Sequence, residues 1–403
     1  MEYTNSGGTW QEISTEGIKF GPGSLYEKFS HLSDPRMARG KRYSLGLIFS
    51  LIISAKLCGE DTPVAIADWA KNRATEIIQA LNLTYAHMPH HSTYRRILEI
   101  VDDVELEEKG REFLKGLKKE KPGEVIAVDG KAIRGTRARE EQRGEHMLAA
   151  YLPEQELVVA QVAVENKENE IVGAPRLLEA IDLHGKILTA DAMHTQKELS
   201  RQVVEGGGDY LFPVKENQKH VFEGIERLFA LDQPKPGFGK IQNDFETDIW
   251  EGKPKHGRIE KRTLTSSCLL NDYLDWPYLG QVYKLERHFA WVYKGKILKT
   301  SDEIEYGITS LTRAKAFPRR LNQIRRLHWG IETKLHYRRD VTFHEDATRM
   351  TRPGAGRNLT AIHNLVLGII SHCGYRNAAE ARRFFSADIN RAFQMALSAN
   401  PRL

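Results

Sequence analysis

The sequence predicts an α/β protein in which a helical N-terminal region precedes a core built on a sheet. Three observations lead to this prediction. Residues 24–118 carry apolar residues at three- and four-residue spacings, which is typical of amphipathic helices. From residue 124 onward the pattern changes to alternation and to short unbroken apolar runs, which is typical of strands. The later strand-like runs then alternate with helical segments, as in a sheet that is covered by helices.

Composition sets the class of protein. With 403 residues and 40% hydrophobic content, the chain can bury a large core and should form two or three domains. Its most apolar run, residues 45–58, is too short to span a bilayer and contains Lys56, so it should be a buried helix. The N-terminus lacks a basic region followed by an apolar one, so we expect no secretory signal and a cytoplasmic protein. Three widely spaced cysteines predict a reducing compartment and neither a disulfide framework nor a zinc site: Cys58, Cys268 and Cys373.

The N-terminal third should contain two parts. Residues 1–23 have little periodicity and are expected to form a loose arm. Residues 24–118 should form a small all-helical domain, with helix starts at Thr62 and Ser92. Arg95 and Arg96, early in one of these helices, are either ordinary surface residues or DNA contacts of the helix-turn-helix kind. The charged linker that follows the helices separates this domain from the core.

The core should begin with the apolar run at residues 125–128, which delivers Asp129 to the end of a buried strand. Alone, this stretch is also compatible with a strand that ends in an Asp-Gly turn. A second apolar run, residues 187–190, ends in Asp191. Strands and helices follow one another in the order of a ribonuclease H-like core, whose first and fourth strands lie side by side and would bring Asp129 and Asp191 together. The predicted segments are strands at 146–152, 157–164 and 210–214 and helices at 171–181, 195–204 and 218–231.

The rest of the chain should complete this core. Residues 233–312 alternate polar and apolar residues between Gly and Pro and predict an antiparallel β-insertion. Residues 313–375 should close the core, and residues 376–403 should form a helical tail. Residues 313–358 hold twelve Lys and Arg against four Asp and Glu, a net charge of +8 in a chain of +5. This concentration favours a polyanion as partner, although a solvated helix face is the alternative.

Several motifs in order along the chain resemble the DDE transposases of the ISAs1 insertion-sequence family, relatives of the IS4-type enzymes. The resemblance covers about residues 30–375. The matching stretches are IAVDGK at 126–131, RGT at 134–136, ENKENEI at 165–171, LTADAM at 188–193 with Gln196, GGDYL at 207–211, KENQ at 215–218, HWGIE at 328–332 and DVTFHED at 340–346. The resemblance implies a ribonuclease H-like catalytic core and a DNA substrate.

Phosphodiester chemistry requires two hard divalent cations held close together by a few carboxylates. The resemblance implies that Asp129, Asp191 and Glu332 are these metal ligands and catalytic acids, and that the cations are two Mg²⁺, which Mn²⁺ can replace. His328, Glu332, Leu335 and Arg339 have the spacing of one helical face. An intrahelical pair of Glu332 with a histidine is the structural alternative.

The resemblance also implies a DNA-binding set: Lys131, Arg134, Lys215, Asn217, Gln218, His256, Arg258, Arg262, Arg325, His328, Trp329, Arg338 and Arg339. The IS4-type pattern places Tyr, Arg, Glu and Lys around the third acid, whereas Arg325, His328 and Arg339 stand at the Tyr, Arg and Lys positions here. This departure leaves the phosphate-binding roles of these residues open. Asp340, Glu345 and Asp346 are the alternatives to Glu332. On the insertion, three tryptophans are candidates either for the core or for stacking on an extruded base: Trp250, Trp276 and Trp291.

The expected function is therefore that of a bacterial-type transposase of the nucleoid. Such an enzyme binds the terminal inverted repeats of its element, cleaves each end and joins the 3′-hydroxyls to target DNA. Pairing of two ends implies at least a homodimer on double-stranded DNA, with no membrane partner. The alternatives are a related nuclease without strand transfer and a catalytically inactive DNA-binding protein.

Overall fold

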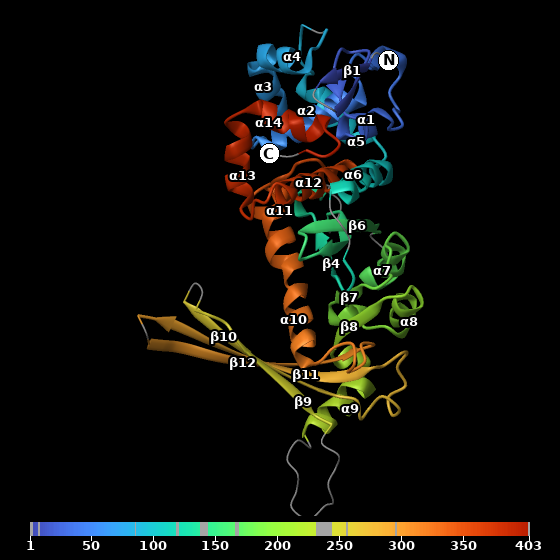
Figure 1. The fold of residues 1–403 in the computed structure, drawn as a ribbon, viewed down its shortest axis with the longest axis vertical. Coiled ribbons are helices and arrows are strands. Elements are labelled where there is room, and N and C mark those ends of the chain that lie inside the picture. Colours follow the sequence, from blue (N-terminus) through green and yellow to red (C-terminus); the bar gives the residue numbers. More distant parts are fainter. Residues whose placement is uncertain are drawn as a thin grey trace, which may run out of the picture.

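The fold is described here from a computed structural model of the chain (Figure 1). The structure describes residues 3–6, 9–84, 86–117, 121–137, 144–165, 169–230, 244–254, 257–294 and 296–401, with side chains from residue 12 onward. In these ranges no helix is both long and apolar enough to cross a membrane. All three cysteines lie in them and are free thiols.

The first 23 residues differ from the expected loose arm. Within the described ranges they contain three antiparallel strands, β1 (Tyr3–Ser6), β2 (Thr9–Ile13) and β3 (Lys19–Phe20). Ile18 and Phe20 are buried, and the buried Glu16 accepts hydrogen bonds from the Ser44 backbone and the Tyr26 hydroxyl. Ile18 and Phe20 join the hydrophobic core of the neighbouring helices, and this burial holds the described end of the segment against them.

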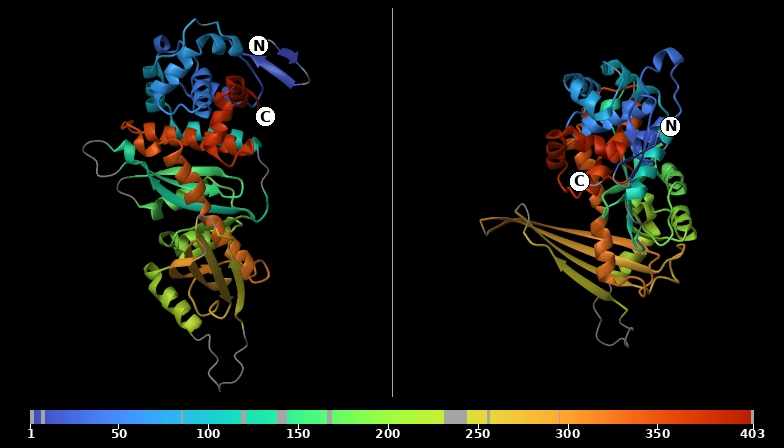
Figure 2. Two further views of the ribbon diagram at one scale, coloured as in Figure 1. Left: turned by 90° about the vertical axis from the view of Figure 1, so that its left-hand side faces the viewer. Right: turned by 45° about the horizontal axis from the view of Figure 1, so that its top comes forward.

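A helical body is formed by both ends of the chain. Its N-terminal helices are α1 (Leu25–Ser30), α2 (Leu45–Leu57), α3 (Pro63–Asn72), α4 (Ala74–Leu81), α5 (His91–Ile100) and α6 (Asp103–Leu117). α2 is buried along its whole length because its apolar residues surround it on every side. The C-terminal helices α12 (Ala355–His372), α13 (Ala378–Ser386) and α14 (Ile389–Leu397) pack against α2 and α6. The predicted C-terminal tail therefore belongs to the same body as the N-terminal helices (Figures 1 and 2).

Of the two predicted helix starts, Thr62 is confirmed by its cap, whereas α5 begins at His91 and its cap is His90 rather than Ser92. Helix α2 has a cap of the same kind as the one at Thr62. The Ser44 hydroxyl accepts a hydrogen bond from the Leu47 backbone at the start of α2, at 3.1 Å. The Thr62 hydroxyl accepts one from the Ala65 backbone before α3, also at 3.1 Å, with Pro63 in the first turn. Both arrangements satisfy backbone donors that an uncapped helix would leave unpaired.

The core is a mixed sheet, and the predicted pairing of its first and fourth strands is observed. Among the described residues, nine strands follow the order β6-β5-β4-β7-β8-β12-β11-β10-β9. β4 (Val125–Ala132) lies parallel to β7 (Ile187–Ala190), which lies parallel to β8 (Asp209–Val214). β5 (His146–Leu152) and β6 (Leu157–Val164) form the predicted antiparallel hairpin. The three helices that alternate with these strands are α7 (Glu170–Glu179), α8 (Lys197–Glu205) and α9 (Lys219–Ala230).

The predicted β-insertion extends this same sheet. Its described strands are β9 (Glu246–Glu251), β10 (Arg258–Ser267), β11 (Gln281–Tyr293) and β12 (Lys296–Thr309), all antiparallel. The last residues of β12 pair with β8, so the insertion continues the core sheet at its edge. Its other end projects away from the body of the molecule (Figure 2). Residues 233–243 of the predicted insertion lie outside the described residues.

Helix α10 (Pro318–His328) crosses the sheet and connects it to the helical body (Figure 1). It packs on β4, β7 and β8 of the core and on β9 and β10 of the insertion. A small hydrophobic cluster lies beneath it, and Leu321 and Ile324 of α10 meet Val125 of β4 and Leu264 of β10 there. The chain then continues into a π-helix, η5 (Ile331–His336), and into α11 (Tyr337–Val341). This packing fixes the segment that carries Glu332 against the strand that carries Asp129.

Candidate active site at the carboxyl ends of the central strands

The register of the central strands brings the first two acids together. Val125 to Val128 of β4 are buried, and Asp129 follows them where the strand becomes partly exposed. Val128 pairs with Ala190 of β7, and Asp191 is the next residue of that chain segment. Because parallel strands end at the same edge of a sheet, both carboxylates lie at one edge. The sequence predicted this arrangement from two short apolar runs.

The third predicted acid lies in the same pocket. Asp129, Asp191 and Glu332 all line it, together with Lys215, Arg287, Arg325, His328 and Trp329. Glu332 is in the π-helix η5, and π-helices are frequently found at functional sites. Asp340, Glu345 and Asp346 do not line this pocket: Asp340 and Asp346 pair with Lys131, and Glu345 is fully buried against Arg339. The geometry therefore favours Glu332 over its alternatives.

Like charges accumulate in this pocket. Burial raises the pKa of Asp129, and the Asp191 charge raises it further, although a hydrogen bond with Glu332 acts in the opposite direction. The pKa of Glu332 is raised by burial and then by its hydrogen bond and repulsion with Asp129. Two carboxyl groups in contact cannot both ionise without a compensating cation, so they share a proton or bind a positive charge.

Asp191 has a different environment. The hydrogen bond to His328 lowers its pKa despite burial, and the charges of Arg325 and Lys215 lower it further. His328 Nε2 lies 3.3 Å from Asp191 Oδ1, and His328 Nδ1 lies 3.1 Å from the hydroxyl of the buried Thr189. His328 is therefore held from both sides and fixes one oxygen of Asp191. A second histidine, His336, has Nε2 at 3.2 Å from Asp129 Oδ2.

Three carboxylates in one pocket match the ligand preference of hard divalent cations such as Mg²⁺. The contact between Asp129 and Glu332 places two such ligands together, and a cation would relieve their repulsion. Asp191 is turned toward His328, and across the described residues no three His, Cys, Asp or Glu side chains converge on one point as ligands of a metal ion. The three carboxylates thus match a divalent cation in donor type and line one pocket, but in this structure they do not converge as a ligand set.

One wall of the pocket contains two arginines, Arg287 of the insertion and Arg325 of α10, each paired with a glutamate of β12. Arg325 makes two hydrogen bonds to Glu305 of β12, at 2.7 and 2.8 Å, and the Tyr283 hydroxyl donates to the same carboxylate. Burial alone would raise the pKa of Glu305, but Arg325 and then Arg287 lower it. Arg287 lies on β11, with its guanidinium 5.4 Å from the centre of the Trp329 ring. Arg287 and Glu305 were not predicted from the sequence. Each lies on a strand whose polar and apolar residues alternate, and that alternation was the available signal.

Two known protein families have models that match this chain. Residues 120–368 match the model described as "Transposase DDE domain". The chain belongs to this family. A second model, described as "DDE_Tnp_1-associated", matches residues 26–114, which are the N-terminal helices of this transposase-family chain.

Known relatives extend over nearly the whole chain. The chain is 27% identical to "H repeat-associated putative transposase YhhI" of Escherichia coli (strain K12), over 92% of this chain and 96% of that one. It is 30% identical to "Putative transposase YncI" of Escherichia coli O157:H7, over 87% and 88% of the two chains. Among solved structures it is similar to "Cryo-EM structure of piggyBac transposase synaptic complex with hairpin DNA (SNHP)". That similarity has a TM-score of 0.46 and 11% identity over 92% of this chain and 76% of the other, which is too low to support a conclusion.

Three arginines that the resemblance assigned to DNA are buried in this family member, and the structure corrects that assignment. Arg339 is completely buried and pairs with Glu345. Arg325 is 3% exposed and pairs with Glu305, and Arg262 is 3% exposed and donates to Asn322 of α10 at 2.9 Å. Because these three guanidinium groups are buried and bonded to protein groups, they are not presented to a phosphate at the surface. Arg339 departs from the predicted shared face because the π-helix changes the helical register after Glu332.

The other predicted DNA contacts divide into exposed and structural residues. Lys215 is exposed and lines the pocket, and the Arg134 side chain is 84% exposed. Lys131 is nearly buried against Asp340, at 2.6 Å, and Arg338 donates to Glu156 at 2.6 Å. Asn217 and Gln218 donate to the carbonyls of Ala192 and Thr195 and so support the turn after Asp191. His256 lies outside the described residues.

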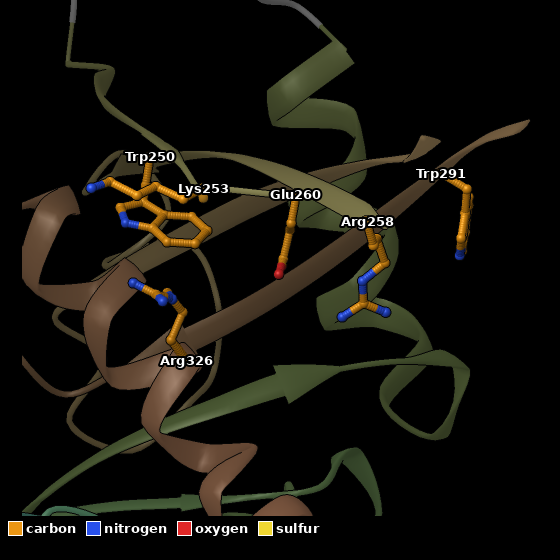
Figure 3. A pocket seen from close by; sticks show the side chains of 7 residues that line it. Trp250, Lys253, Arg258, Glu260, Trp291 and Arg326 are labelled. Carbon is orange, nitrogen blue, oxygen red and sulfur yellow. The ribbon is translucent and has the colours of Figure 1, made fainter. Parts of the chain in front are cut away.

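The tryptophans of the insertion have two different roles. Trp276 is a core residue, since it is 5% exposed and its indole N–H donates to the Ser200 hydroxyl. Trp250 and Trp291 line a second pocket with Arg258, Glu260 and Arg326 (Figure 3). The Arg326 guanidinium lies 3.5 Å from the centre of the Trp250 ring, and the Lys299 ammonium lies 5.4 Å from that of Trp291. These two tryptophans are thus accessible aromatic surfaces in a cationic setting.

Proposed function

We propose that this transposase-family chain is an active DNA transposase of the ISAs1 type with a ribonuclease H-like catalytic core. Its substrates would be the terminal inverted repeats of its own element and a double-stranded target DNA. The observation that carries the proposal is the meeting of Asp129, Asp191 and Glu332 in one pocket from β4, the end of β7 and η5. The strand order β6-β5-β4-β7-β8 supports the assignment of the core.

The three carboxylates would hold Mg²⁺ or Mn²⁺. Bound divalent cations supply the Lewis acidity that activates the attacking oxygen and stabilises the leaving oxygen in phosphodiester chemistry. His328 restrains Asp191 through one ring nitrogen while Thr189 occupies the other. Such restraint holds the carboxylate in one orientation, as partners behind metal ligands usually do.

The cationic wall would position the DNA. Lys215 lines the pocket and is exposed, so it can approach a phosphate, whereas Arg287 lines the pocket in a pair with Glu303 at 2.8 Å and would exchange that carboxylate for a phosphate. Trp329, which is 45% exposed beside Arg287, offers a flat surface to a base or sugar at the pocket mouth. Because cleavage at both ends of an element is coordinated, we expect at least a homodimer when two DNA ends are bound.

The test uses the purified full-length chain with Mg²⁺ and labelled DNA that carries the sequences flanking its own gene. Denaturing gels resolve nicked ends, and joined products are detected with a second, unlabelled duplex. We expect both cleavage and joining from the wild type, and neither from Glu332→Gln. Asp346→Asn is the matched control because Asp346 is the alternative acid and lies outside the pocket.

Each rival function has its own result in this assay. Cleavage without joined product would identify a nuclease, and specific DNA binding without cleavage would identify an inactive binding protein. Cleavage that survives Glu332→Gln and is lost in Asp346→Asn would overturn the assignment of the third acid.

A further inference from the structure

One partly buried glutamate contacts the segments that follow both of the first two acids. Glu170 is the first residue of α7 and belongs to the ENKENEI stretch, for which the proposed chemistry provides no role. Its carboxylate accepts hydrogen bonds from two histidines, His146 Nε2 on Oε1 at 2.9 Å and His194 Nε2 on Oε2 at 3.1 Å. The side chain of Glu170 is 16% exposed, and that of His194 is completely buried.

The bond to His194 fixes the turn that follows the second acid. His194 closes the 3-10 turn η3 (Ala192–His194), which begins immediately after Asp191. The backbone N–H of His194 donates to the Asp191 carbonyl at 2.9 Å. A displacement of the His194 ring would therefore be transmitted directly to the backbone of Asp191.

The same carboxylate lies against the residue that follows the first acid. A Cβ atom placed on Gly130 would stand 2.3 Å from Glu170 Oε1 and 2.6 Å from Oε2, well inside van der Waals contact. Only glycine at this position allows the carboxylate to approach the β4 backbone so closely. Glu170 therefore contacts both Gly130, which follows Asp129, and His194, in the turn that follows Asp191.

The surroundings keep Glu170 charged and its bonds strong. Burial alone would raise the pKa of this carboxyl, but the hydrogen bonds from His146 and His194 lower it to about 2. The position in the first turn of α7 also favours a negative charge. Hydrogen bonds to an ionised carboxylate are roughly twice as strong as neutral ones, so this contact is suited to hold two segments in place.

We propose that Glu170 is a positioning residue that sets the separation of Asp129 and Asp191 by holding the Ala192–His194 turn, through His194, against Gly130. The proposal rests on the proposed function, because the spacing of the acids matters for phosphodiester cleavage. His146 anchors the carboxylate to β5, a strand that carries neither acid. Displacements of about 1 Å in a catalytic arrangement can cost on the order of 10²-fold in rate.

The test compares Glu170→Gln with His146→Gln in the full-length chain. We expect Glu170→Gln to lower the single-turnover cleavage rate on the order of 10²-fold, while the DNA concentration for half-saturation changes less than about twofold. His146→Gln leaves the bond to His194 and should lower the rate only a few-fold. Hydrogen exchange requires no activity: amides of residues 192–195 should exchange faster in Glu170→Gln than in His146→Gln.

A second pair of variants tests the contact with Gly130. In the otherwise wild-type chain, Gly130→Ala should displace the Glu170 carboxylate and slow cleavage strongly. In a Glu170→Ala background the same change should slow cleavage little further, because the carboxylate that the new Cβ would meet is absent. Additive effects of the two changes, or normal exchange at residues 192–195 in Glu170→Gln, would overturn the proposal. A wild type that does not cleave would contradict the proposed function, whereas the exchange result would still decide the role of Glu170.

Discussion

The buried pair of Arg325 and Glu305 provides a quantitative test of how the pocket wall is built. Glu305→Gln keeps the shape of the side chain and removes its charge, which leaves Arg325 without a counter-ion at 3% exposure. Arg262, also 3% exposed, is a further cation near Glu305. Removing one partner of a buried pair costs about 3–5 kcal/mol because the remaining charge is uncompensated. We therefore expect a loss of this size in the free energy of unfolding.

The matched control is Glu303→Gln, two residues earlier on the same strand. Glu303 pairs with Arg287 at 2.8 Å, but its side chain is 50% exposed, so its loss should cost about 0.2–1 kcal/mol. Urea titration followed by tryptophan fluorescence measures both variants. Replacing both partners, in Glu305→Leu with Arg325→Leu, should recover most of the stability. If Glu305→Gln were no less stable than Glu303→Gln, Arg325 would not be a structural residue, and its assignment to DNA would be restored.

Three further predictions concern the acids, the cationic wall and the buried lysine of α2. Asp129→Asn should abolish cleavage, while the affinity for DNA measured by gel shift should stay equal or rise slightly, because a negative charge near the phosphates is removed. A large loss of DNA affinity would instead indicate a structural role for this acid. Arg287→Ala should weaken DNA binding for all sequences and reduce the slope of log affinity against log salt by about one, and an unchanged slope would exclude a phosphate contact. Burial lowers the pKa of Lys56 from 10.5 to about 8, so the folded state loses this proton at a lower pH than the unfolded state does. The free energy of unfolding should therefore rise as the pH increases from about 8 to about 10.5. Denaturation of Lys56→Met at each pH should show no such rise in stability. If the rise persisted in this variant, another titrating group would be its cause.

The sequence was sufficient to place the first two acids, Asp129 and Asp191, because strands impose simple rules. A short apolar run that ends in an aspartate defines the end of a buried strand, and Asp129 and Asp191 each follow such a run. The order of elements then implied the parallel pairing of β4 with β7 that the structure contains. Both inferences depend only on local pattern and chain order, and neither requires knowledge of side-chain contacts.

The roles of the arginines could not be predicted in the same way. Composition near Glu332 showed a concentration of positive charge, but the partners of these charges are distant in sequence. Arg325 pairs with Glu305 on a strand of the insertion, and Arg338 pairs with Glu156 in the β5–β6 hairpin. A net charge counted along the chain contains no information about such pairs, so it overestimated the cationic surface available to DNA.

The π-helix explains why helical spacing also failed beyond Glu332. In a regular α-helix, residues 328, 332, 335 and 339 would share a face and Arg339 would approach the acids. The wider turn over Ile331–His336 instead leaves Glu332 and His336 beside Asp129 and turns Arg339 into the core, where Glu345 neutralises it. Glu345 is in turn bonded to His363 of α12, whose other ring nitrogen lies 3.0 Å from Lys56 of α2. The segment that carries the third acid is thus tied through buried charges to the helical body formed by both ends of the chain. The placement of Glu332 therefore depends on residues more than two hundred positions away in sequence, which local periodicity cannot reveal.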